Sequence, residues 1–323
     1  MITRWHWCVL ICVNVCYAVL LKECSGIDGS FEHTLPRFSK SIIPDMKGKI
    51  KGDAGKIGVI GGSTEYTGAP YFAAISALKV GADLVYVITT ENAAPIIKSY
   101  SPDLIVYPYL QNNHVAKISA LLRKMDVIVI GPGLGRDDST LRLIFDIIKT
   151  CNDLTKPLII DADGLYFLSK NMLILQNYPS PGAILTPNVR EADKLKVAAN
   201  SSTWFRMWGE NVSVLVKGEE DKFYSSNSLL NWSSAEGGTG RRAGGQGDIL
   251  SGSLGTFFNW AIKSRLCENN DSVHLAHSVA TYAAAKFTRE CNSKAFDVHG
   301  RSLTASDMLN YIHVSFDNIF NVI

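Results

Sequence analysis

The chain has 323 residues, of which 46% are hydrophobic and 19% are charged, and its formal net charge is +2. A hydrophobic fraction of this size is enough to bury a large core, which excludes a disordered or fibrous protein. The small net charge and the lack of lysine or arginine blocks give no strong field of one sign. We therefore expect no nucleic-acid partner.

The first residues differ in character from the rest of the chain. An arginine precedes a long apolar run that ends at Leu21 and is followed by a lysine and small residues. This order is typical of a signal peptide or a short signal anchor, whereas a mitochondrial presequence, the alternative, is amphipathic and rich in arginine and serine. We expect a targeting segment at residues 1–26, a connecting segment at 27–46 and a single domain at 47–323.

The cysteines and the glycosylation sequons say little about the fold or the compartment. Four of the seven cysteines lie in the N-terminal segment, and Cys151, Cys267 and Cys291 are widely spaced. Without CxxC spacing they predict neither a disulfide scaffold nor a zinc site, and we expect them to be reduced. Four Asn-X-Ser sequons matter only if the chain enters the secretory route.

From residue 47 onward, short β-branched runs alternate with segments of helical periodicity. The runs predict buried strands at 56–62, 82–89, 125–133, 156–164, 182–188 and 212–218. Between them, apolar residues recur at helical spacing at 69–81, 139–151 and 188–199. This alternation predicts a mostly parallel sheet covered by helices on both faces, with ligands beyond the carboxyl ends of the strands.

The last third of the chain has a different pattern. Residues 221–226 and 228–234 predict a pair of strands on either side of Asn227. Helices are then predicted at 247–263, 273–291 and 304–316, the first starting at about Ile249. We find no internal repeat or linker after residue 47, which favours one domain.

The stretch GGTGRRAGGQGD, residues 237–248, ends at the start of a predicted helix. Glycines 244, 245 and 247 allow backbone N–H groups to turn inward, and the positive end of the helix favours an anion there. Asp248 is either a simple helix cap or a base that removes a proton from a hydroxyl attacking a γ-phosphoryl group. Two arginines upstream favour the second interpretation, because arginine binds phosphate oxygens.

Other phosphate motifs are absent from the sequence. There is no GxxxxGK[ST] segment, and GPGLGRD at 131–137 does not satisfy GxGxxG. Another architecture must therefore hold the phosphates.

A GxGD turn that opens a late helix in an α/β/α domain resembles the ribokinase-like superfamily, in which the aspartate is the catalytic base of phosphoryl transfer. Within it, eight blocks in chain order are similar to the eukaryotic ATP-dependent NAD(P)H-hydrate dehydratase family. These blocks are residues 51–89, 101–108, 130–137, 159–165, 185–195, 216–223, 240–255 and 299–308. The resemblance implies a three-layer α/β/α ribokinase-like fold with a mostly parallel central sheet.

The resemblance also implies an activity. The substrates would be (6S)-NADHX or (6S)-NADPHX, which are hydrated forms of NADH and NADPH, together with ATP as co-substrate and Mg²⁺. Asp248 would remove the proton of the ring hydroxyl, which is phosphorylated and then lost as phosphate. The family resemblance further suggests a homo-oligomer that acts alongside an NAD(P)HX epimerase, in the mitochondrion or the cytoplasm.

The family's site residues are carried over by position. The ATP-binding residues would be Lys217, Gly218, Glu219, Glu220, Asp221, Gly238, Thr239, Gly240, Arg241, Arg242, Ala243, Gly244, Gly245, Gln246 and Gly247. The residues that bind the hydrated dinucleotide would be Gly133, Gly135, Asn188, Val189, Arg190, Glu191, Ala192, Asp193, Lys194 and Asp248. The alternatives are a plain strand-ending turn for GPGLG, the first turn of a solvated helix for 188–194 and a plain hairpin for 217–221.

Five further residues carry weaker expectations. Asp161 and Asp163 follow a predicted strand and are either Mg²⁺ ligands or helix caps. Tyr66 lies in a turn at the same edge, where we expect the nicotinamide end of the substrate. His277 and His299 lack metal-ligand spacing, and we expect them to be structural.

Two other functions stay open at this point. A ribokinase-like kinase for a small molecule such as a vitamin precursor would use the same aspartate but release a stable phosphoester. A nucleotide-binding sensor without turnover is the third possibility, which the intact GQGD turn disfavours.

Overall fold

The computed structural model describes residues 31–267 and 271–320, so the expected targeting segment lies outside the described residues. In the described part of the chain, nine strands form one sheet in the order β3-β2-β1-β4-β5-β6-β7-β8-β9. Strands β1 to β7 pair in parallel, while β8 and β9 are antiparallel. The strands are β1 (Lys56–Ile60), β2 (Leu84–Ile88), β3 (Ile105–Tyr107), β4 (Val127–Ile130), β5 (Leu158–Ile160), β6 (Ala183–Leu185), β7 (Val212–Val216), β8 (Asp221–Tyr224) and β9 (Trp232–Ser234).

Each of the six long runs contains one parallel strand, which confirms those predictions. Strand β3 was not predicted, because it has three residues of which the outer two are only half-buried. The predicted pair after β7 is confirmed as β8 and β9, except that Ser228–Leu230 forms a short 3₁₀ helix instead of extending the second strand.

The helices surround this sheet. The α-helices are α2 (Phe31–Ser41), α3 (Gly68–Val80), α4 (Ala94–Tyr100), α5 (Val115–Leu122), α6 (Asp138–Asp153), α7 (Ala162–Leu168), α8 (Val189–Ala199), α9 (Gln246–Ser264), α10 (Asp271–His299), α11 (Ala305–Leu309) and α12 (Ile312–Phe320). The 3₁₀ helices are η1 (Asn112–His114), η2 (Met172–Leu175), η3 (Trp204–Arg206), η4 (Ser228–Leu230) and η5 (Gly300–Ser302). Residues 304–316 were expected to form one helix but form α11 and the start of α12.

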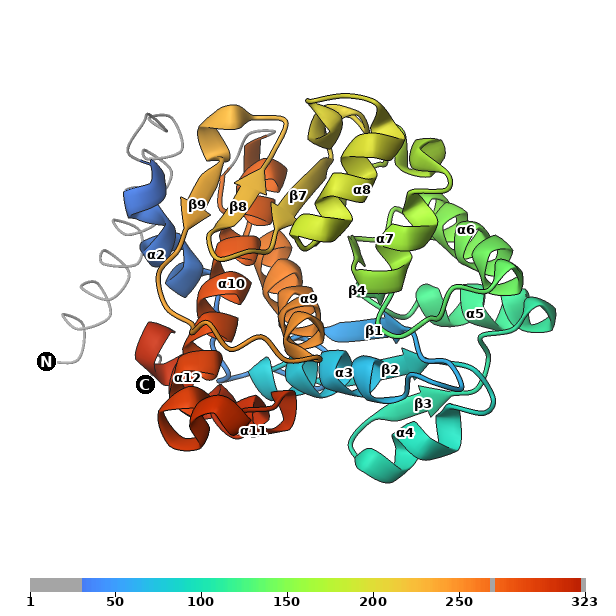
Figure 1. Cartoon of the computed structure of the whole chain (residues 1–323), viewed down its shortest axis with the longest axis horizontal. Helices are drawn as coiled ribbons and strands as arrows, with labels where there is room; N and C mark the ends of the chain where they lie inside the picture. Colours follow the sequence, from blue (N-terminus) through green and yellow to red (C-terminus); the bar gives the residue numbers. More distant parts are fainter. Residues whose placement is uncertain (1–30, 268–270, 321–323) are drawn as a thin grey trace, which may run out of the picture.

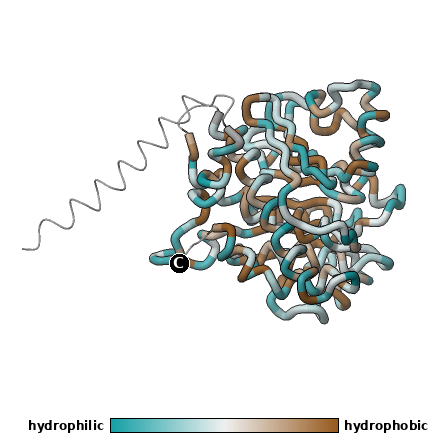
Figure 2. Tube along the Cα trace, turned by 60° about the vertical axis from the view of Figure 1, so that its left-hand side comes forward, coloured by the Kyte–Doolittle hydropathy of each residue, from teal (hydrophilic) through white to brown (hydrophobic). Residues whose placement is uncertain are grey.

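The helices make two layers, one on each face of the sheet (Figure 1). Alternate residues of each parallel strand enter different cores: Ile57 and Val59 of β1 join one hydrophobic cluster, while Ile60 joins the other. The first cluster is covered by α2, α3, α4 and α9 to α12, and the second by α5 to α8. Burial on both faces explains why the strands are uninterrupted apolar runs, and hydrophobic residues concentrate inside the molecule (Figure 2). The expected three-layer fold is confirmed.

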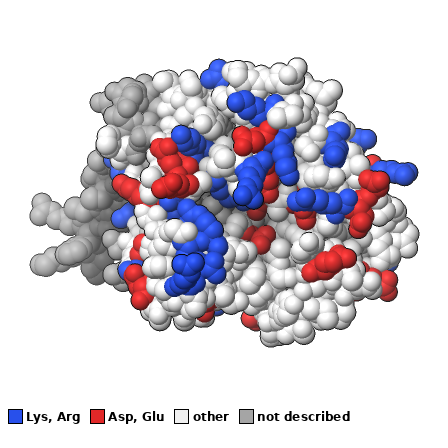
Figure 3. Space-filling model, viewed as in Figure 1, with Lys and Arg blue, Asp and Glu red and all other residues white. Residues whose placement is uncertain are grey.

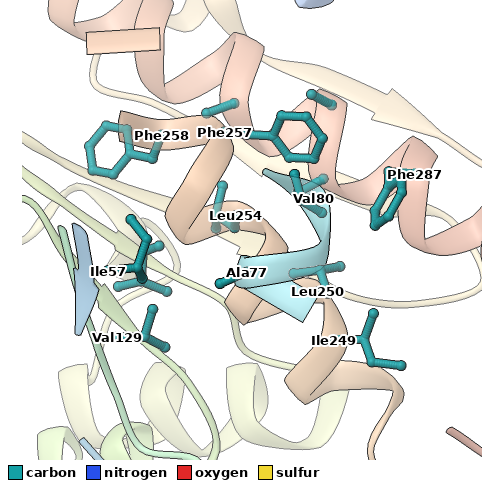
Figure 4. Packing of buried hydrophobic residues seen from close by; sticks show 14 of the residues in the cluster. Ile57, Ala77, Val80, Val129, Ile249, Leu250, Leu254, Phe257, Phe258 and Phe287 are labelled. Atoms are coloured by element: carbon teal, nitrogen blue, oxygen red, sulfur yellow. The ribbon is translucent and has the colours of Figure 1, made fainter. Parts of the chain in front are cut away.

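Helix α9 packs closely on α3 and on the central strands (Figure 4). A Cβ atom at Gly252 of α9 would lie 1.9 Å from the carbonyl oxygen of Ala73, so only glycine allows this approach. Two buried hydroxyls cross the interface: Ser76 donates to the carbonyl of Ile249, and Thr256 donates to the carbonyl of Ala77. These contacts set the position of α9, whose first turn carries Asp248.

The segment expected to be a connection contains helix α2. Leu35, Phe38 and Ile42 are buried in the first cluster, and α2 contacts α10. No helix among the described residues is both long and apolar enough for a membrane span.

The body cysteines differ from one another. Cys151 and Cys291 are free and buried, whereas Cys267 is disulfide-bonded. The expectation that all three are reduced is therefore wrong for Cys267. A disulfide needs no local spacing motif, which is why the sequence did not indicate it.

Candidate active site

The turns that follow the parallel strands gather at one edge of the sheet. Asn188, after β6, forms an isolated parallel bridge with Lys217, after β7. The bridge continues with the N–H of Lys217, which donates to the carbonyl of Pro187 at 2.8 Å. It joins the segment expected to bind the dinucleotide to the first segment expected to bind ATP.

Asp248 lies in the first turn of α9. The helix begins at Gln246, earlier than predicted, and its N-cap is Gly245. The interpretation of Asp248 as the cap is therefore wrong, because its backbone is already helical. Of glycines 244, 245 and 247, only Gly245 has a positive φ, at 91°, and a Cβ there would lie 2.6 Å from the Cβ of Ala305.

The carboxyl group of Asp248 has an unusual environment. Its pKa is raised to about 7, mainly by burial and next by the Asp161 carboxylate, while Lys217 opposes both. Asp163 and Glu191 also raise it, so four acidic groups of the sheet edge act on one another. A carboxylate with a pKa near neutrality is suited to accept a proton in catalysis.

Lys217 and Asp161 form an ion pair in this region. The Nζ atom lies 2.6 Å from Oδ1, and the side chains are 17% and 1% exposed. Burial lowers the pKa of Lys217, but Asp161 and Glu191 outweigh it and hold the pKa above its usual value. Lys217 is therefore a permanent cation, and a Cβ at Gly247 would lie 3.2 Å from its Nζ atom.

Two adjoining cavities lie beside the N-terminus of α9. One of about 310 Å³ is lined by Asn188 and by both expected ATP segments, and one of about 540 Å³ continues along the loop before α9. Together they are lined by twelve of the expected site residues: Asn188, Lys217, Gly218, Glu219, Asp221, Gly238, Thr239, Gly240, Arg242, Ala243, Gln246 and Gly247. The structure thus brings together most of the residues assigned to ATP.

Some expected ATP residues lie outside these cavities. Glu220 forms an exposed ion pair with Lys222, and Arg241, Gly244 and Gly245 line neither cavity. Asp248 lines neither cavity either, although Gly247 before it does.

The segment expected to bind the dinucleotide begins with a capping box. The side chain of Asn188 accepts from the N–H of Glu191 at 3.0 Å, and that of Glu191 accepts from the N–H of Asn188 at 2.8 Å. Burial raises the pKa of Glu191 above its ordinary value. Val189, Arg190, Asp193 and Lys194 are exposed, whereas Ala192 is buried in the second cluster. The capping contacts match the alternative of an ordinary helix start, so the role of this segment stays a prediction.

The GPGLG turn lies at the same edge of the sheet. The N–H of Gly135 donates to Asp163, whose other carboxylate oxygen accepts from Arg136 at 2.9 Å. Gly133 has a φ of 64°, and a Cβ there would lie 2.8 Å from the Cβ of Tyr66. Tyr66 is 54% exposed, and its expected position near the nicotinamide end of the substrate stays a prediction.

The two lone histidines make protein contacts. Nδ1 of His277 lies 2.9 Å from the hydroxyl of Ser213, and Nε2 donates to the carbonyl of Pro181 at 2.7 Å. Burial lowers the pKa of His277 to about 4, so the ring is neutral. Nε2 of His299 lies 3.8 Å from Oδ1 of Asp307, and both side chains are half-buried.

The described residues contain no group of three potential metal ligands. Asp161 is paired with Lys217, and Asp163 is paired with Arg136. The two carboxylates that were expected as Mg²⁺ ligands are therefore already neutralised by basic side chains.

Helix α10 supplies site residues that the sequence did not indicate. Arg289 donates to the carboxylate of Asp221 at 2.7 Å and to the carbonyls of Gly218, Glu219 and Gly237 at 2.9 to 3.1 Å. The Arg289 and Asp221 side chains are 12% and 6% exposed. One guanidinium group therefore ties together the two segments expected to bind ATP.

A second contact from α10 holds the same loop. Asn292 accepts from the N–H and the hydroxyl of Thr239, both at 2.8 Å, and Ser293 accepts from the N–H of Gly238 at 3.0 Å. The available signal in the sequence was the group of polar residues at 288–293 in a helix of small and apolar residues. On the face seen in Figure 1, basic and acidic side chains gather together around the centre of the molecule (Figure 3).

Comparisons with known proteins agree on one family. A family model described as NAD(P)H-hydrate dehydratase matches residues 57–313. The chain is 46% identical over 286 residues to the ATP-dependent (S)-NAD(P)H-hydrate dehydratase of Aedes aegypti, covering 87% of this chain and 84% of that protein.

Solved structures agree on the fold. A ribokinase-like superfamily protein of Enterococcus faecalis superposes with a TM-score of 0.71 and 18% identity, over 88% of this chain and 94% of that one. The ADP/ATP-dependent NAD(P)H-hydrate dehydratase of Bacillus subtilis, co-crystallised with ATP and Mg²⁺, gives 0.65 and 20% identity over 88% and 97%. The fold is therefore ribokinase-like, and the chain belongs to the NAD(P)H-hydrate dehydratase family.

Proposed function

We propose that the protein is an ATP-dependent (S)-NAD(P)H-hydrate dehydratase, a hydro-lyase that converts (6S)-NADHX and (6S)-NADPHX to NADH and NADPH. The observation that carries this proposal is the position of Asp248, in the first turn of α9, next to Lys217 and to the cavity lined by the expected ATP segments. The family membership and the name of the Aedes aegypti relative support it.

The first step is a phosphoryl transfer. Asp248 removes the proton of the ring hydroxyl while the hydroxyl oxygen bonds to the γ-phosphorus of ATP, and the bond to the β-phosphate oxygen breaks to release ADP. Backbone N–H groups at the start of α9, together with Lys217 and Arg242, face the negative charge of the phosphates.

The second step is the loss of phosphate. Hydroxide is a poor leaving group, because the pKa of water is about 15.7, whereas the second pKa of a phosphoester is about 6. The lone pair of the ring nitrogen forms a C=N bond as the C–O bond breaks and phosphate leaves. Loss of a proton from the neighbouring carbon then restores the dihydropyridine ring.

The proposed reaction uses ATP as its magnesium complex. When bound, Mg²⁺ neutralises phosphate charge and orients the γ-phosphoryl group. Because Asp161 and Asp163 are already paired, the phosphate oxygens and water would supply most of its ligands. Removal of Mg²⁺ with a chelator is expected to abolish turnover.

A direct assay tests the proposed function. The protein is incubated with ATP and hydrated NADH, and the near-ultraviolet absorbance of NADH is followed together with free phosphate. We expect the two to appear in equal amounts. Release of ADP with a stable phosphoester and no NADH would instead indicate a small-molecule kinase, and no turnover at all would indicate a sensor.

Replacement of Asp248 sharpens this assay. Asp248→Asn keeps the shape of the side chain but cannot accept the proton, so we expect kcat to fall by about 10²- to 10⁴-fold. The affinity for ATP should change little. An unchanged kcat would contradict the assignment of Asp248 as the base.

The cellular context is also a proposal. We infer from residues 1–26 that the chain is directed to a membrane-bound compartment, and sequencing the N-terminus of the mature protein tests this. An NAD(P)HX epimerase in the same compartment would supply the S form, and light scattering of the purified enzyme would test for a homo-oligomer.

A further inference from the structure

The cavity of about 310 Å³ has a polar face made by α10. Thr288 and Asn292 both line it, and their side chains lie one helical turn apart on the same side of the helix. Thr288 is 8% exposed and Asn292 is 4% exposed, so both polar groups are buried. Neither residue belongs to the segments assigned to ATP from the sequence.

The orientation of the Asn292 amide follows from its contacts. The backbone N–H of Thr239 can only donate, so the atom that it reaches at 2.8 Å must be the amide oxygen. The amide nitrogen, Nδ2, then points elsewhere, and it has no hydrogen-bond partner in residues 31–267 and 271–320. A buried N–H group without a partner is destabilising, so it indicates an acceptor on a ligand.

Thr288 has the opposite character. Its hydroxyl donates to the carbonyl of Ala284 at 2.8 Å, one turn earlier in α10. Since its only proton is used there, the oxygen can act toward the cavity only as an acceptor. Thr288 and Asn292 thus offer one acceptor and one donor side by side.

The other residues that line the cavity form an apolar part and a basic part. Leu250, Ala285 and Met308, all buried, contribute apolar surface near α10. The cations Lys217 and Arg242 line the cavity with the first turn of α9. A nucleotide matches this division when its base lies against α10 and its phosphates lie at α9.

We propose that Thr288 and Asn292 bind the nucleobase of ATP and select adenine over guanine. Adenine carries an exocyclic amine next to an acceptor nitrogen on either side, which matches the acceptor of Thr288 and the donor of Asn292. Guanine carries a carbonyl oxygen in place of the amine, and this oxygen would face the lone pairs of Thr288. The inference rests on the proposed function, because it takes ATP as the ligand of this cavity.

Calorimetric titration without dinucleotide tests the proposal on the intact protein. Thr288→Val removes the acceptor, and Asn292→Asp keeps the oxygen that Thr239 needs but replaces the donor with a second acceptor. We expect each change to raise the Kd of ATP by about tenfold and to reduce the preference for ATP over GTP by a similar factor. Circular dichroism verifies that both variants are folded.

Base analogues separate recognition from a structural role. Purine riboside triphosphate lacks the amine, so it should bind the wild type about tenfold more weakly than ATP does. Thr288→Val should bind the analogue and ATP with equal affinity. 1-Deaza-ATP and 7-deaza-ATP each lack one of the two acceptor nitrogens beside the amine. One of them should bind the wild type more weakly than ATP does but bind Asn292→Asp with the same affinity as ATP. Ser293→Ala loosens the same loop at Gly238 without facing the base, so it should change the affinity of every nucleotide equally.

The outcomes are distinct from those of the dehydratase assay. If each analogue penalty has the same size in the variants as in the wild type, Thr288 and Asn292 do not bind the base and the proposal is wrong. If the penalties disappear in the variants, the proposal stands even for a protein that forms no NADH. If the protein forms NADH but the analogues are weakened equally in the variants and the wild type, the proposed function stands and the inference about the base is wrong.

Discussion

The Nζ atom of Lys217 lies 2.6 Å from Oδ1 of Asp161, and this buried ion pair acts electrostatically on Asp248. Lys217→Met leaves the Asp161 carboxylate buried without a partner, so we expect the free energy of unfolding to fall by about 3 to 5 kcal/mol. The pKa of Asp248 should rise further, because Lys217, which lowers it, is removed. Urea denaturation and the pH dependence of kcat measure the two effects.

Lys222→Met is the matched control for Lys217. Lys222 pairs with Glu220 on the surface, where both side chains are more than 40% exposed, so the change should leave the free energy of unfolding almost unaltered. The double variant Lys217→Met with Asp161→Asn should regain part of the lost stability, because no uncompensated charge remains. Equal losses for Lys217→Met and Lys222→Met would contradict the buried pair.

The activity should depend on pH through Asp248. The group acts as a base only when it is ionised, and its pKa is raised to about 7. We expect kcat/KM for the hydrated dinucleotide to rise about tenfold per pH unit below pH 7 and to level off above it. A flat profile from about pH 5 to pH 8 would show that another group sets the rate.

The same pKa affects stability. The pKa of Asp248 in the folded protein lies above its ordinary value of 3.8. Between these two pH values the folded protein therefore binds a proton that the unfolded chain has released. Stability is therefore lost as pH rises through this window. Asp248→Asn should be more stable than the wild type at pH 8, by up to about 4 kcal/mol, and equally stable at pH 4. Thermal unfolding at the two pH values measures this difference.

Arg289 should act on ATP and not on the dinucleotide. Arg289→Met breaks its contacts with Asp221 and with both ATP segments, so we expect the KM of ATP to rise by about tenfold or more and stability to fall by about 3 to 5 kcal/mol. Arg289→Lys keeps the charge but not the planar fork, so it should recover stability more than the KM of ATP. A matching rise in the KM of the dinucleotide would indicate general loosening instead.

The glycines of α9 provide a test of its close packing. Gly252→Ala would place a methyl group 1.9 Å from a backbone oxygen of α3, so we expect a loss of more than about 3 kcal/mol or failure to fold. Gly255→Ala is the control, because its Cβ would lie 3.1 Å from the Ile57 side chain and 3.3 Å from that of Val129, so shifts of a few tenths of an ångström would accommodate it. Similar unfolding temperatures for the two variants would contradict the assigned packing.

The strands of the central sheet and the position of Asp248 at the start of a helix could be predicted from the sequence for physical reasons. Strands buried on both faces are unbroken apolar runs, and the GGQGD turn combines backbone flexibility with one acidic group at a helix start. Strand β3 was missed because it has only three residues, one buried between two half-buried ones, which is too short to show a period.

The contribution of α10 was missed for a different reason. Arg289 and Asn292 follow the loops that they hold by more than 50 residues in sequence. Periodicity tells which side of a helix is buried, but it does not tell which distant loop lies over that side.

Helix α2 places a limit on proteolytic maturation. Its buried Leu35 and Phe38 share a hydrophobic cluster with α10, the helix that carries Arg289 and Asn292. If residues 1–26 are removed by a protease, as proposed above, we expect the cut to fall before Leu35, because a later cut would uncover apolar surface of α10. We therefore expect a truncation beyond Leu35 to weaken ATP binding as well as stability, because α10 contacts α2 and also holds the loop before α9.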